Sequence, residues 1–504
     1  MLTHINTLTF NGLEVQKVDL QTQISSGLPN FIIVGLPDKA IAESKERVRA
    51  AIQSLGLQLP AKRIVINLAP ADLLKEGSHF DLPLALGILA VMGVVPAEKL
   101  KSYVILGELG LDGEILPVNG VLPVAVYASK NNMGIICPKA CGSEAAWTKV
   151  KDIIAAPHLA SLINHLKGTE TLPPPSADKQ VVAASPLDMA DVKGQETAKR
   201  ALEVAAAGGH NLLMVGPPGS GKSMLAARLP TILPPMSLEE ALETSMIHSI
   251  AGELKDSALN FIRPFRSPHH NASTPALVGG GRKGTPGEIS LAHNGVLFLD
   301  ELPEFNRPTL EALRQPLENG SIQISRVNAH TSYPADFQLI AAMNPCRCGY
   351  LGIKEKECAR APICAKEYMS KISGPLLDRI DIKIEVPAVN PWDLAEAKTG
   401  ESSKVIQSRV IAARKIQSDR LRALGEMAFH TNAGLKGKLL EAVCEMEKDA
   451  EALLIAFADK NLLSARAYHR TLRLARTIAD LQNESKILKL HIAEALSYRQ
   501  SQYF

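Results

Sequence analysis

The sequence predicts an α/β protein that ends in a helical region, and three observations lead to that prediction. Short β-like apolar runs alternate with helical patterns before residue 168. Further along, a glycine-rich segment at 216–223 separates the apolar run 211–215 from a helical pattern that begins near Met224. From about residue 391 onward the pattern is helical, with no strand signal. The expected architecture is two α/β domains followed by a small helical domain.

The first predicted domain spans residues 1–168. Its strands are short apolar runs at 31–34, 63–67, 104–108 and 134–137, and its helices include 40–54 and 82–91. A linker is expected at 169–185, because Pro173, Pro174 and Pro175 stand in a stretch that lacks apolar periodicity.

The second predicted domain, 186–390, binds a nucleotide, and the third, 391–504, is helical. In the second, the expected strands 211–215, 295–300 and 338–343 form a parallel sheet with its ligand at the carboxyl ends of the strands. In the third, the expected helices are 404–424, 435–446, 464–481 and 487–499.

Composition restricts the class of protein. The chain has 504 residues, of which 46% are hydrophobic and 21% charged, and it contains no run of 18 apolar residues, which argues against membrane and disordered proteins. The N-terminus lacks the zones of a signal peptide, so a cytoplasmic location is expected. Because the net charge is only +3, any contact with nucleic acid must use locally placed basic residues.

The segment 216–223 has the pattern of a phosphate-binding loop and stands between a strand and a helix, as such a loop requires. Its residues are Gly216, Pro217, Pro218, Gly219, Ser220, Gly221, Lys222 and Ser223. Amides of a glycine-rich loop at a helix start can surround phosphates, Lys222 adds positive charge, and the Ser223 hydroxyl can ligate Mg²⁺. A later apolar strand ends in Asp300 and Glu301, and the two features together predict an NTPase.

Four cysteines lie close together in the sequence, just after the expected strand 338–343. They are Cys346, Cys348, Cys358 and Cys364. Four thiolates match Zn²⁺ in number and softness, and Pro345 and Gly349 favour the turn that a shared site needs. The cluster, an insertion at 346–364, therefore predicts structural zinc, with free thiols as the alternative.

The whole chain resembles AAA+ ATPases of the magnesium-chelatase-like group, and in particular the bacterial ComM/YifB family. Besides the phosphate loop, the segments that carry the resemblance are 30–37, 66–73, 191–195, 265–270, 279–302, 341–349, 374–381 and 463–480. The resemblance implies a phosphate-loop AAA+ module with a C-terminal helical lid, binding ATP and Mg²⁺.

The resemblance also implies roles around the γ-phosphate. Asp300 should hold Mg²⁺ together with Ser223, and Glu301 should orient and deprotonate the attacking water. Asn344 resembles the sensor that positions this water, although by itself such a residue could equally cap a turn. The cysteine cluster begins two residues later and could brace this strand end.

Further residues implied by the resemblance lie elsewhere in the sequence. Arg379 resembles the arginine finger that these enzymes insert into the neighbouring subunit's site, and Arg466 resembles the second sensor, carried by the lid. Asp191, Val192, Gly194 and Gln195 stand where such proteins place backbone against the adenine. A finger from a neighbour implies a ring, usually of six subunits.

Two glycine-flanked segments are candidates for contact with DNA. Arg282 and Lys283 form a basic tip between glycines, in an insertion that the resemblance places at the central pore of the ring. Arg326 stands near the tip of a second segment, a hairpin expected at 320–335. Ordinary solvated loops are the alternative for both. The basic helix at 404–422 is interpreted as a solvated face or a subunit contact.

The N-terminal domain resembles the Lon protease domain, whose nucleophile is a serine activated by lysine. In the alignment of motifs, His79 takes the place of the serine and Leu122 that of the lysine, so no working Ser/Lys dyad is expected. Lys75, His79 and Asp81 are interpreted as surface or loop-fixing residues.

The resemblance to the ComM/YifB family implies a hexameric DNA helicase that binds single-stranded and branched DNA. It would promote branch migration in homologous recombination during natural transformation, with recombination proteins among its possible partners. Two alternatives remain. One is a chelatase-type ATPase that remodels a partner protein, and the other is an ATP-dependent Lon-like protease, which the missing dyad opposes.

Overall fold

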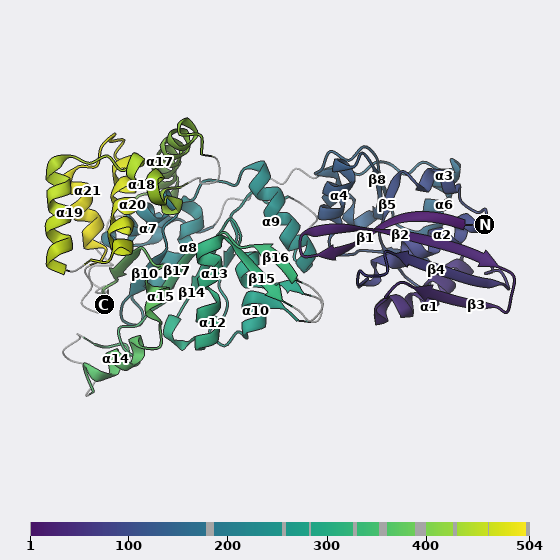
Figure 1. Cartoon of the computed structure of the whole chain (residues 1–504), viewed down its shortest axis with the longest axis horizontal. Helices are drawn as coiled ribbons and strands as arrows, with labels where there is room; N and C mark the ends of the chain where they lie inside the picture. Colours follow the sequence, from purple (N-terminus) through teal and green to yellow (C-terminus); the bar gives the residue numbers. More distant parts are fainter. Residues whose placement is uncertain are drawn as a thin grey trace.

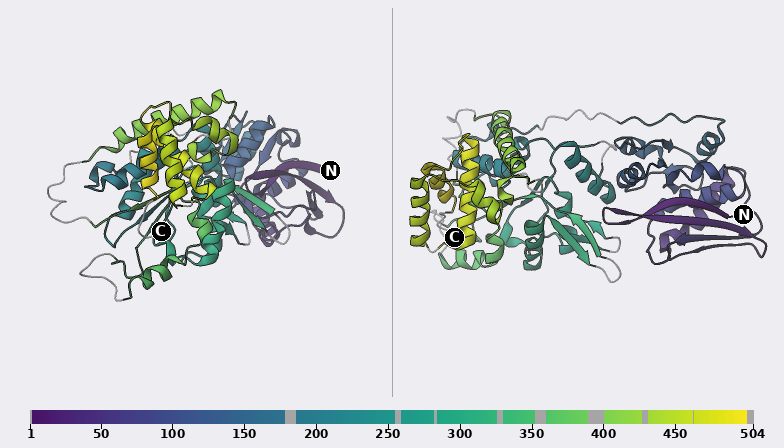
Figure 2. Two further views of the ribbon diagram at one scale, coloured as in Figure 1. Left: turned by 60° about the vertical axis from the view of Figure 1, so that its left-hand side comes forward. Right: turned by 45° about the horizontal axis from the view of Figure 1, so that its top comes forward.

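The computed structural model describes residues 2–177, 186–254, 259–281, 284–325, 330–351, 360–388, 400–426, 431–461 and 463–499. The molecule is elongated: an N-terminal α/β unit lies at one end, a second α/β unit in the middle, and the C-terminal helices at the other end (Figure 1). Two further views show the same separation of the N-terminal sheet from the C-terminal helices (Figure 2).

A mixed seven-stranded sheet in the order β3-β4-β2-β1-β5-β8-β9 forms the N-terminal unit. Its strands are β1 (Leu2–Asn11), β2 (Glu14–Ser25), β3 (Asn30–Val34), β4 (Arg63–Ala69), β5 (Tyr103–Ile105), β8 (Gly134–Pro138) and β9 (Ile153–Ala156). β1 and β2 form a long antiparallel hairpin, whereas β3 pairs with β4, and β5 with β1 and β8, in parallel. The predicted strand 104–108 is in fact two elements, because the chain turns after β5 into a small ribbon of β6 (Glu108–Leu109) and β7 (Ile115–Leu116).

Helices cover this sheet. They are α1 (Lys39–Ser54), α2 (Asp81–Val91), α3 (Ala97–Leu100), α4 (Val121–Lys130), α5 (Gly142–Ala146) and α6 (Leu159–Lys167). α2 is almost entirely apolar and buried, so it forms the centre of this core rather than a half-exposed surface helix. The segment expected to be a linker is partly packed: Leu172 contacts the same core, and Pro175 lies against Gly142.

The central unit is built on a five-stranded sheet in the order β11-β14-β17-β10-β18. The strands are β10 (Leu212–Val215), β11 (Phe265–Arg266), β14 (Val296–Leu299), β17 (Gln338–Met343) and β18 (Ile382–Glu385). All neighbours are parallel, which confirms the predicted parallel sheet. β10 is the first of these strands in the chain yet lies between β17 and β18, so the strand order reverses beside it, where open α/β sheets bind ligands.

The remaining elements of the central unit surround this sheet. The helices are α7 (Glu196–Gly208), α8 (Lys222–Ile232), α9 (Leu238–Ala251), α10 (Thr274–Val278), α11 (Glu288–Leu291), α12 (Arg307–Ala312), α13 (Arg314–Asn319), α14 (Ile363–Met369) and α15 (Gly374–Leu377). Two hairpins project from it: β12 (Gly279–Gly280) with β13 (Thr285–Pro286), and β15 (Ser321–Ser325) with β16 (His330–Pro334).

The C-terminal region is helical, as predicted. Its helices are α17 (Ser403–Ala423), α18 (Gly437–Val443), α19 (Lys448–Asn461), α20 (Ala465–Leu481) and α21 (Lys489–Ser497). α17 and α20 pack against α7, so the lid and one face of the five-stranded sheet share a single hydrophobic core. None of the helices in the described ranges combines the length and apolar composition needed to cross a bilayer.

Polar contacts join the N-terminal and central units at two places among the described residues, and Leu13 and Trp147 add apolar contacts to the central unit. At the tip of the β1–β2 hairpin, Asn11 Oδ1 accepts a hydrogen bond of 2.8 Å from Thr331 Oγ1 in β16. At the second contact, Gly120 N donates to Ser249 O at 3.2 Å, and Ser249 Oγ donates to the carboxylate of Glu144. Burial raises the pKa of Glu144, although hydrogen bonds from Ser249 and from Leu122 N oppose that effect.

Candidate nucleotide-binding site

The phosphate loop joins β10 to α8 with a backbone that only glycine adopts easily. Gly219 and Gly221 have φ angles of 77° and 88°, in the left-handed region. Gly216 is required for a different reason: a Cβ there would lie 2.1 Å from the carbonyl oxygen of Val386, which follows β18. The loop therefore closes tightly against the end of β18 and leads directly into α8, whose N-terminus favours a bound anion.

Lys222 is buried at the start of α8, and its ammonium group is held by oxygens around it. Nζ donates to Gly216 O at 2.8 Å, to Pro217 O at 2.9 Å and to Asn344 Oδ1 at 3.3 Å. Burial lowers the pKa of Lys222, and the carboxylates of Asp300 and Glu301 oppose that effect. The structure thus brings together the predicted lysine and the predicted sensor, which are far apart in sequence.

The two acids at the end of β14 point in different directions. Ser223 Oγ donates to Asp300 Oδ2 at 2.6 Å, and Asp300 Oδ1 accepts from Glu301 N at 2.9 Å. Glu301 has φ 52°, a strained conformation for a residue with a side chain, and half of its side chain is exposed. Asp300 is therefore engaged by the start of α8, whereas the Glu301 carboxylate is left facing outward.

The sequence reasoning did not identify the partner of Glu301. His270 Nδ1 lies 3.3 Å from Glu301 Oε2, and His270 also stacks on His269 with ring centroids 4.2 Å apart. The motif at 265–270 was recognised, but no local pattern relates a histidine after an edge strand to an acid in the neighbouring strand. Only the pairing of β11 with β14 brings the two together.

The segment at 191–195 reaches the same site through Gln195. Its Nε2 donates to Pro387 O at 2.7 Å and to Ser220 O at 3.3 Å, so it joins the phosphate loop to the chain after β18. Val192 is buried, and Gly194 has φ 67°. Asp191 is bound to Arg228 at 3.0 Å, which lowers its pKa and fixes the turn before α7.

Arg379 lies at the opposite edge of the five-stranded sheet from the phosphate loop. It precedes β18, and its carbonyl accepts from Asn211 Nδ2 at 2.9 Å, at the amino end of β10. The phosphate loop follows the carboxyl end of the same strand, so four residues of β10, roughly 13 Å, separate the two edges. The guanidinium group of Arg379 is paired with Glu318.

Arg466 is on the same side as Arg379. It is exposed in the first turn of α20, and Arg470, one turn further, donates to Ile380 O at 3.2 Å and to Asp378 Oδ1 at 3.1 Å. Arg379 and Arg470 therefore stand at the amino edge of the sheet, away from Lys222 of the same chain, and Arg466 lies one helical turn before Arg470.

Comparison with known proteins places the whole chain in one family. Three family profiles match: "Magnesium chelatase, subunit ChlI" over residues 188–394, "Subunit ChlI of Mg-chelatase" over 20–141, and "Magnesium chelatase, subunit ChlI C-terminal" over 400–499. The chain is 45% identical to the competence protein ComM of Haemophilus influenzae over 97% of its own length and 95% of that protein's. The chain belongs to the magnesium-chelatase-like ComM/YifB family.

Other members of the ComM/YifB family match over nearly their full length. The uncharacterized protein YifB of Salmonella typhimurium is 44% identical, covering 99% of this chain and 97% of that protein. The uncharacterized protein Rv2897c of Mycobacterium tuberculosis is 41% identical, covering 98% of each. Membership of this AAA+ family indicates an ATPase, for which ATP and Mg²⁺ are the expected ligands.

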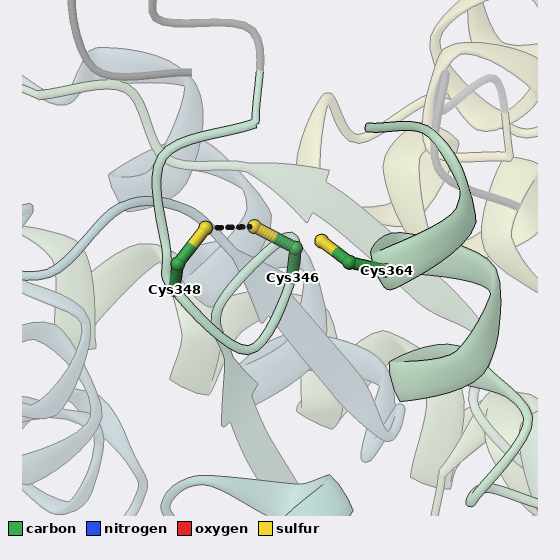
Figure 3. A group of neighbouring side chains, drawn as sticks. All are labelled: Cys346, Cys348 and Cys364. Atoms are coloured by element: carbon green, nitrogen blue, oxygen red, sulfur yellow. Dashed lines mark hydrogen bonds between the residues drawn. The ribbon is translucent and has the colours of Figure 1, made fainter. Parts of the chain in front are cut away.

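Three of the four clustered cysteines of this ComM/YifB-family chain converge, two from the loop after β17 and one from α14 (Figure 3). The sulfur atoms of Cys346, Cys348 and Cys364 lie within 4.8 Å of one another, close enough to share one metal ion, and the first two are 3.1 Å apart. Burial alone would raise the pKa of the Cys346 thiol, but hydrogen bonds from Cys348 and from the backbone amides of Leu351, Gly349 and Tyr350 lower it. Cys358 lies outside the described residues.

The three predicted DNA-contacting residues, Arg282, Lys283 and Arg326, also lie outside the described part of the chain. The bases of the two hairpins that carry them pack together. Tyr333 Oη donates to Gly284 O at 2.7 Å, and Ile324 is so close to Gly279 that a Cβ there would lie 2.9 Å from Ile324 Cδ1. The two segments therefore leave the sheet side by side.

Three of the six basic residues in the helix predicted at 404–422 bind partners within the chain. In α17, Arg409 pairs with Glu203 and Glu401, Arg420 pairs with Asp480, and Arg414 is buried against the carbonyl of Ala206. These arginines dock the lid onto α7 and α20, whereas Lys404, Lys415 and Arg422 are exposed and form the solvated face that the sequence suggested.

Lys75, His79 and Asp81 of the N-terminal unit are buried, so the surface interpretation of these residues is wrong and the loop-fixing one remains. Lys75 is buried with its ammonium bonded to Pro70 O, and His79 Nε2 lies 2.9 Å from Leu8 O. Asp81 is fully buried and accepts from Arg47 Nε at 2.6 Å. Burial lowers the pKa of both Lys75 and His79. Leu122, in the place of the protease lysine, is part of the apolar core.

Proposed function

We propose that the chain is an ATP-driven DNA translocase that assembles as a ring, most specifically a hexameric helicase that promotes branch migration during homologous recombination in natural transformation. The observation that carries the ring is the placement of Lys222 and Arg379 on opposite edges of one sheet. The role in competence rests on 45% identity to a protein named competence protein ComM.

The residues around the phosphate loop fit ATP and Mg²⁺. The Lys222 ammonium would exchange its carbonyl partners for phosphate oxygens, and Gly216–Gly221 would offer amides to the same phosphates. Ser223 and Asp300, already 2.6 Å apart, would hold Mg²⁺, which neutralises charge on the phosphates when bound. The donor set of ammonium, hydroxyl, amides and carboxylates suits a nucleoside triphosphate with a hard divalent cation.

Glu301 is the proposed general base. Its carboxylate is half exposed and is not engaged by the phosphate loop, so it can accept the proton of an attacking water. His270, 3.3 Å away, would position this carboxylate. Asn344, already 3.3 Å from Lys222, would orient the same water from the end of β17. Asp191, Val192, Gly194 and Gln195 are proposed to line the adenine, with Gln195 bonded to the phosphate loop.

Arg379 and Arg466 are proposed to act on the ATP held by the neighbouring subunit. Arg379 lies at the amino edge of the five-stranded sheet and Arg466 one helical turn before Arg470 of that edge, whereas the ATP of the same chain would lie at the carboxyl edge. A guanidinium group placed on a neighbour's γ-phosphate stabilises the charge of the transition state. Arg379 would first exchange its pairing with Glu318 for this contact.

Arg282, Lys283 and Arg326 are proposed to contact the DNA backbone. Support comes from the packing of Gly284 and Gly279 of one hairpin against Tyr333 and Ile324 of the other, which brings the described bases of the two hairpins together. Contacts of this kind bind single-stranded and branched DNA without sequence preference and weaken with salt.

Zinc is the proposed occupant of the cysteine cluster, with Cys358 as the fourth ligand. The three described sulfur atoms are close enough to share an ion, and the backbone amides that donate to Cys346 favour a thiolate. Zinc bound by four thiolates supplies structural cross-linking and no chemistry of its own.

A second candidate is supported by the names of the matching family profiles, all of which refer to a magnesium chelatase subunit. Such an ATPase would remodel a partner protein instead of moving along DNA. The identity of 45% over the whole chain to a competence protein favours the DNA-directed function.

The deciding experiment measures ATP hydrolysis with and without single-stranded, duplex and branched DNA, followed by strand displacement and branch migration at low salt. Stimulation by DNA and movement of the branch point are expected. ATP hydrolysis without any response to DNA would favour the partner-remodelling alternative.

Subunit mixing tests the ring. Lys222→Ala and Arg379→Ala each remove one half of the proposed shared site. A mixture of the two inactive variants should recover part of the ATPase activity. At some interfaces the Arg379→Ala chain supplies an intact Lys222, and its neighbour, the Lys222→Ala chain, supplies an intact Arg379. No recovery in rings that are verified to be mixed would contradict the shared site.

A further inference from the structure

One short segment of the chain lies along the phosphate loop. Met343 O accepts from Gly216 N at 3.2 Å, and Asn344 Oδ1 accepts from Lys222 Nζ at 3.3 Å. A few residues later, Gly349 is so close to Pro218 that a Cβ there would lie 2.6 Å from Pro218 Cδ. The loop that carries Cys346 and Cys348 therefore contacts the phosphate loop at its beginning, middle and end.

The third thiol comes from a helix later in the chain. Cys364 is in α14, and the same helix carries Tyr368, which is buried near the turn that follows Glu301. Burial, together with the carboxylates of Glu304 and Glu301, raises the pKa of Tyr368. Lys371, just beyond α14, pairs with Glu304 at 3.3 Å. α14 is thus packed against the segment that positions the proposed general base.

The three sulfur atoms join these two segments (Figure 3). We propose that a thiophilic divalent cation held here, zinc by its chemistry, controls the affinity of the ATP site. Resting on the ATPase function and the zinc occupancy proposed above, this inference adds that metal binding and nucleotide binding are thermodynamically coupled. The metal fixes the loop of Cys346 and Cys348 to α14, and that loop fixes Asn344 and Pro218.

Metal binding should strengthen ATP binding, because ordering the two segments costs conformational entropy. Without a metal, the small apolar cluster of Cys346, Leu351, Cys364 and Ala365 still joins the two segments, but the cross-link between their thiols is lost and both segments regain conformational freedom. ATP binding must then order Asn344 and the phosphate loop again, which weakens the affinity. Coupling between two binding equilibria is reciprocal, so bound nucleotide strengthens metal binding by the same factor.

The first experiment compares Cys364→Ser with Cys137→Ala in the full-length chain. Cys137 is a buried thiol of the N-terminal core and serves as the matched control. Zinc per chain is measured by elemental analysis, and the affinity for ATP with Mg²⁺ by calorimetry. Cys364→Ser is expected to lose zinc and to bind ATP about tenfold more weakly or worse, the scale on which metal-site changes act. Cys137→Ala should match the parent chain in both.

A second variant disturbs the contact between the cysteine loop and the phosphate loop without removing a metal ligand. Gly349→Ala keeps every cysteine but places a methyl group against Pro218 at a backbone with φ 86°. The variant should retain zinc and still lose affinity for ATP. If Gly349→Ala binds ATP as the parent does, the route from the cysteine loop to the phosphate loop is wrong.

The third measurement uses the unaltered protein, so it does not depend on whether Cys364→Ser folds. Release of zinc to a chromogenic chelator is followed with and without a non-hydrolysable ATP analogue. Nucleotide should slow or reduce release by a factor similar to that seen in ATP affinity. Equal release in both conditions, or zinc-free chains that bind ATP like the parent, overturns the coupling. A protein that holds zinc and binds ATP with coupling, but never responds to DNA, would contradict only the proposed function.

Discussion

The two α/β units of the molecule differ in whether their clustered ionisable residues are accessible to a ligand. At the carboxyl edge of the five-stranded sheet, Ser223 and Glu301 remain exposed, and Lys222 is held by carbonyl groups that a phosphate can replace. In the seven-stranded unit, Lys75, His79 and Asp81 are buried and bonded to interior partners. A cluster of ionisable residues is a candidate site only where its groups stay accessible to a ligand.

Activity and stability should therefore depend on different residues. The accessible groups at the carboxyl edge of the five-stranded sheet contribute little to folding, and the buried cluster of Lys75, His79 and Asp81 contributes little to chemistry. Substitutions at the carboxyl edge should therefore change nucleotide handling at nearly constant stability. Substitutions in the N-terminal cluster should do the reverse.

The largest expected effect is that of Glu301→Gln. Loss of a general base should lower the turnover of ATP by about 10²–10⁴-fold. The affinity for ATP and the melting temperature should stay close to those of the parent chain, since the Glu301 carboxylate is half exposed. Single-turnover hydrolysis and calorimetric binding measure the two quantities. Normal turnover by this variant would show that another group acts as the base.

Lys222→Ala should have the second-largest effect, a loss of affinity for ATP. A removed ammonium group that would pair with phosphate costs about 2–5 kcal/mol, a loss of affinity of roughly 30-fold or more. Fluorescence anisotropy with a labelled ATP analogue gives the affinity. Lys404→Ala, an exposed lysine in α17, is the matched control and should bind as the parent does.

His79→Ala tests the buried cluster of Lys75, His79 and Asp81 in the N-terminal unit. Removing the ring leaves Leu8 O without its partner and opens space beside Phe10 and Phe80, so the free energy of unfolding should fall by about 1–3 kcal/mol. The rate of ATP hydrolysis per folded chain should change by less than about twofold, because His79 touches none of the nucleotide-site residues described above. A strong loss of activity without loss of stability would give this unit a role in chemistry.

Glu144→Gln should have the smallest effect, and it should depend on pH. Burial raises the pKa of Glu144 in the folded chain, so folding disfavours its ionised form. The parent chain therefore loses stability as the pH rises from the ordinary pKa of glutamate through the raised one, and it regains that stability in acid. Glutamine keeps the acceptor for Leu122 N and Ser249 Oγ, so thermal unfolding of the variant should lack this component, an effect of about 1 kcal/mol. An identical pH profile for both chains would contradict the interpretation.

Much of the ATP site could be predicted because its parts are encoded locally. The phosphate loop, the acids after β14 and Asn344 after β17 each follow an apolar run, and parallel strands bring their carboxyl ends together. The contact between His270 and Glu301 could not be predicted, because it depends on which strands are neighbours. The burial of Lys75 was missed for a similar reason: its partner is a loop carbonyl, and sequence gives no sign of it.

The fold shows the same limit. The helices at the C-terminus follow their apolar periodicity closely, yet α19 was not foreseen, and neither was the β1–β2 hairpin. Threonine and glutamine alternate with apolar residues along these strands, a pattern without the dense apolar runs used to recognise the others. β11, with only two residues, is too short for any periodicity.

The hairpin also has a mechanical consequence. Ten consecutive residue pairs join β1 to β2, which makes it a stiff ribbon about 30 Å long. Its base is in the seven-stranded sheet, and its tip is bonded through Asn11 to Thr331 of β16. A force applied to the β15–β16 hairpin would therefore be carried along this ribbon into the seven-stranded sheet of the N-terminal unit.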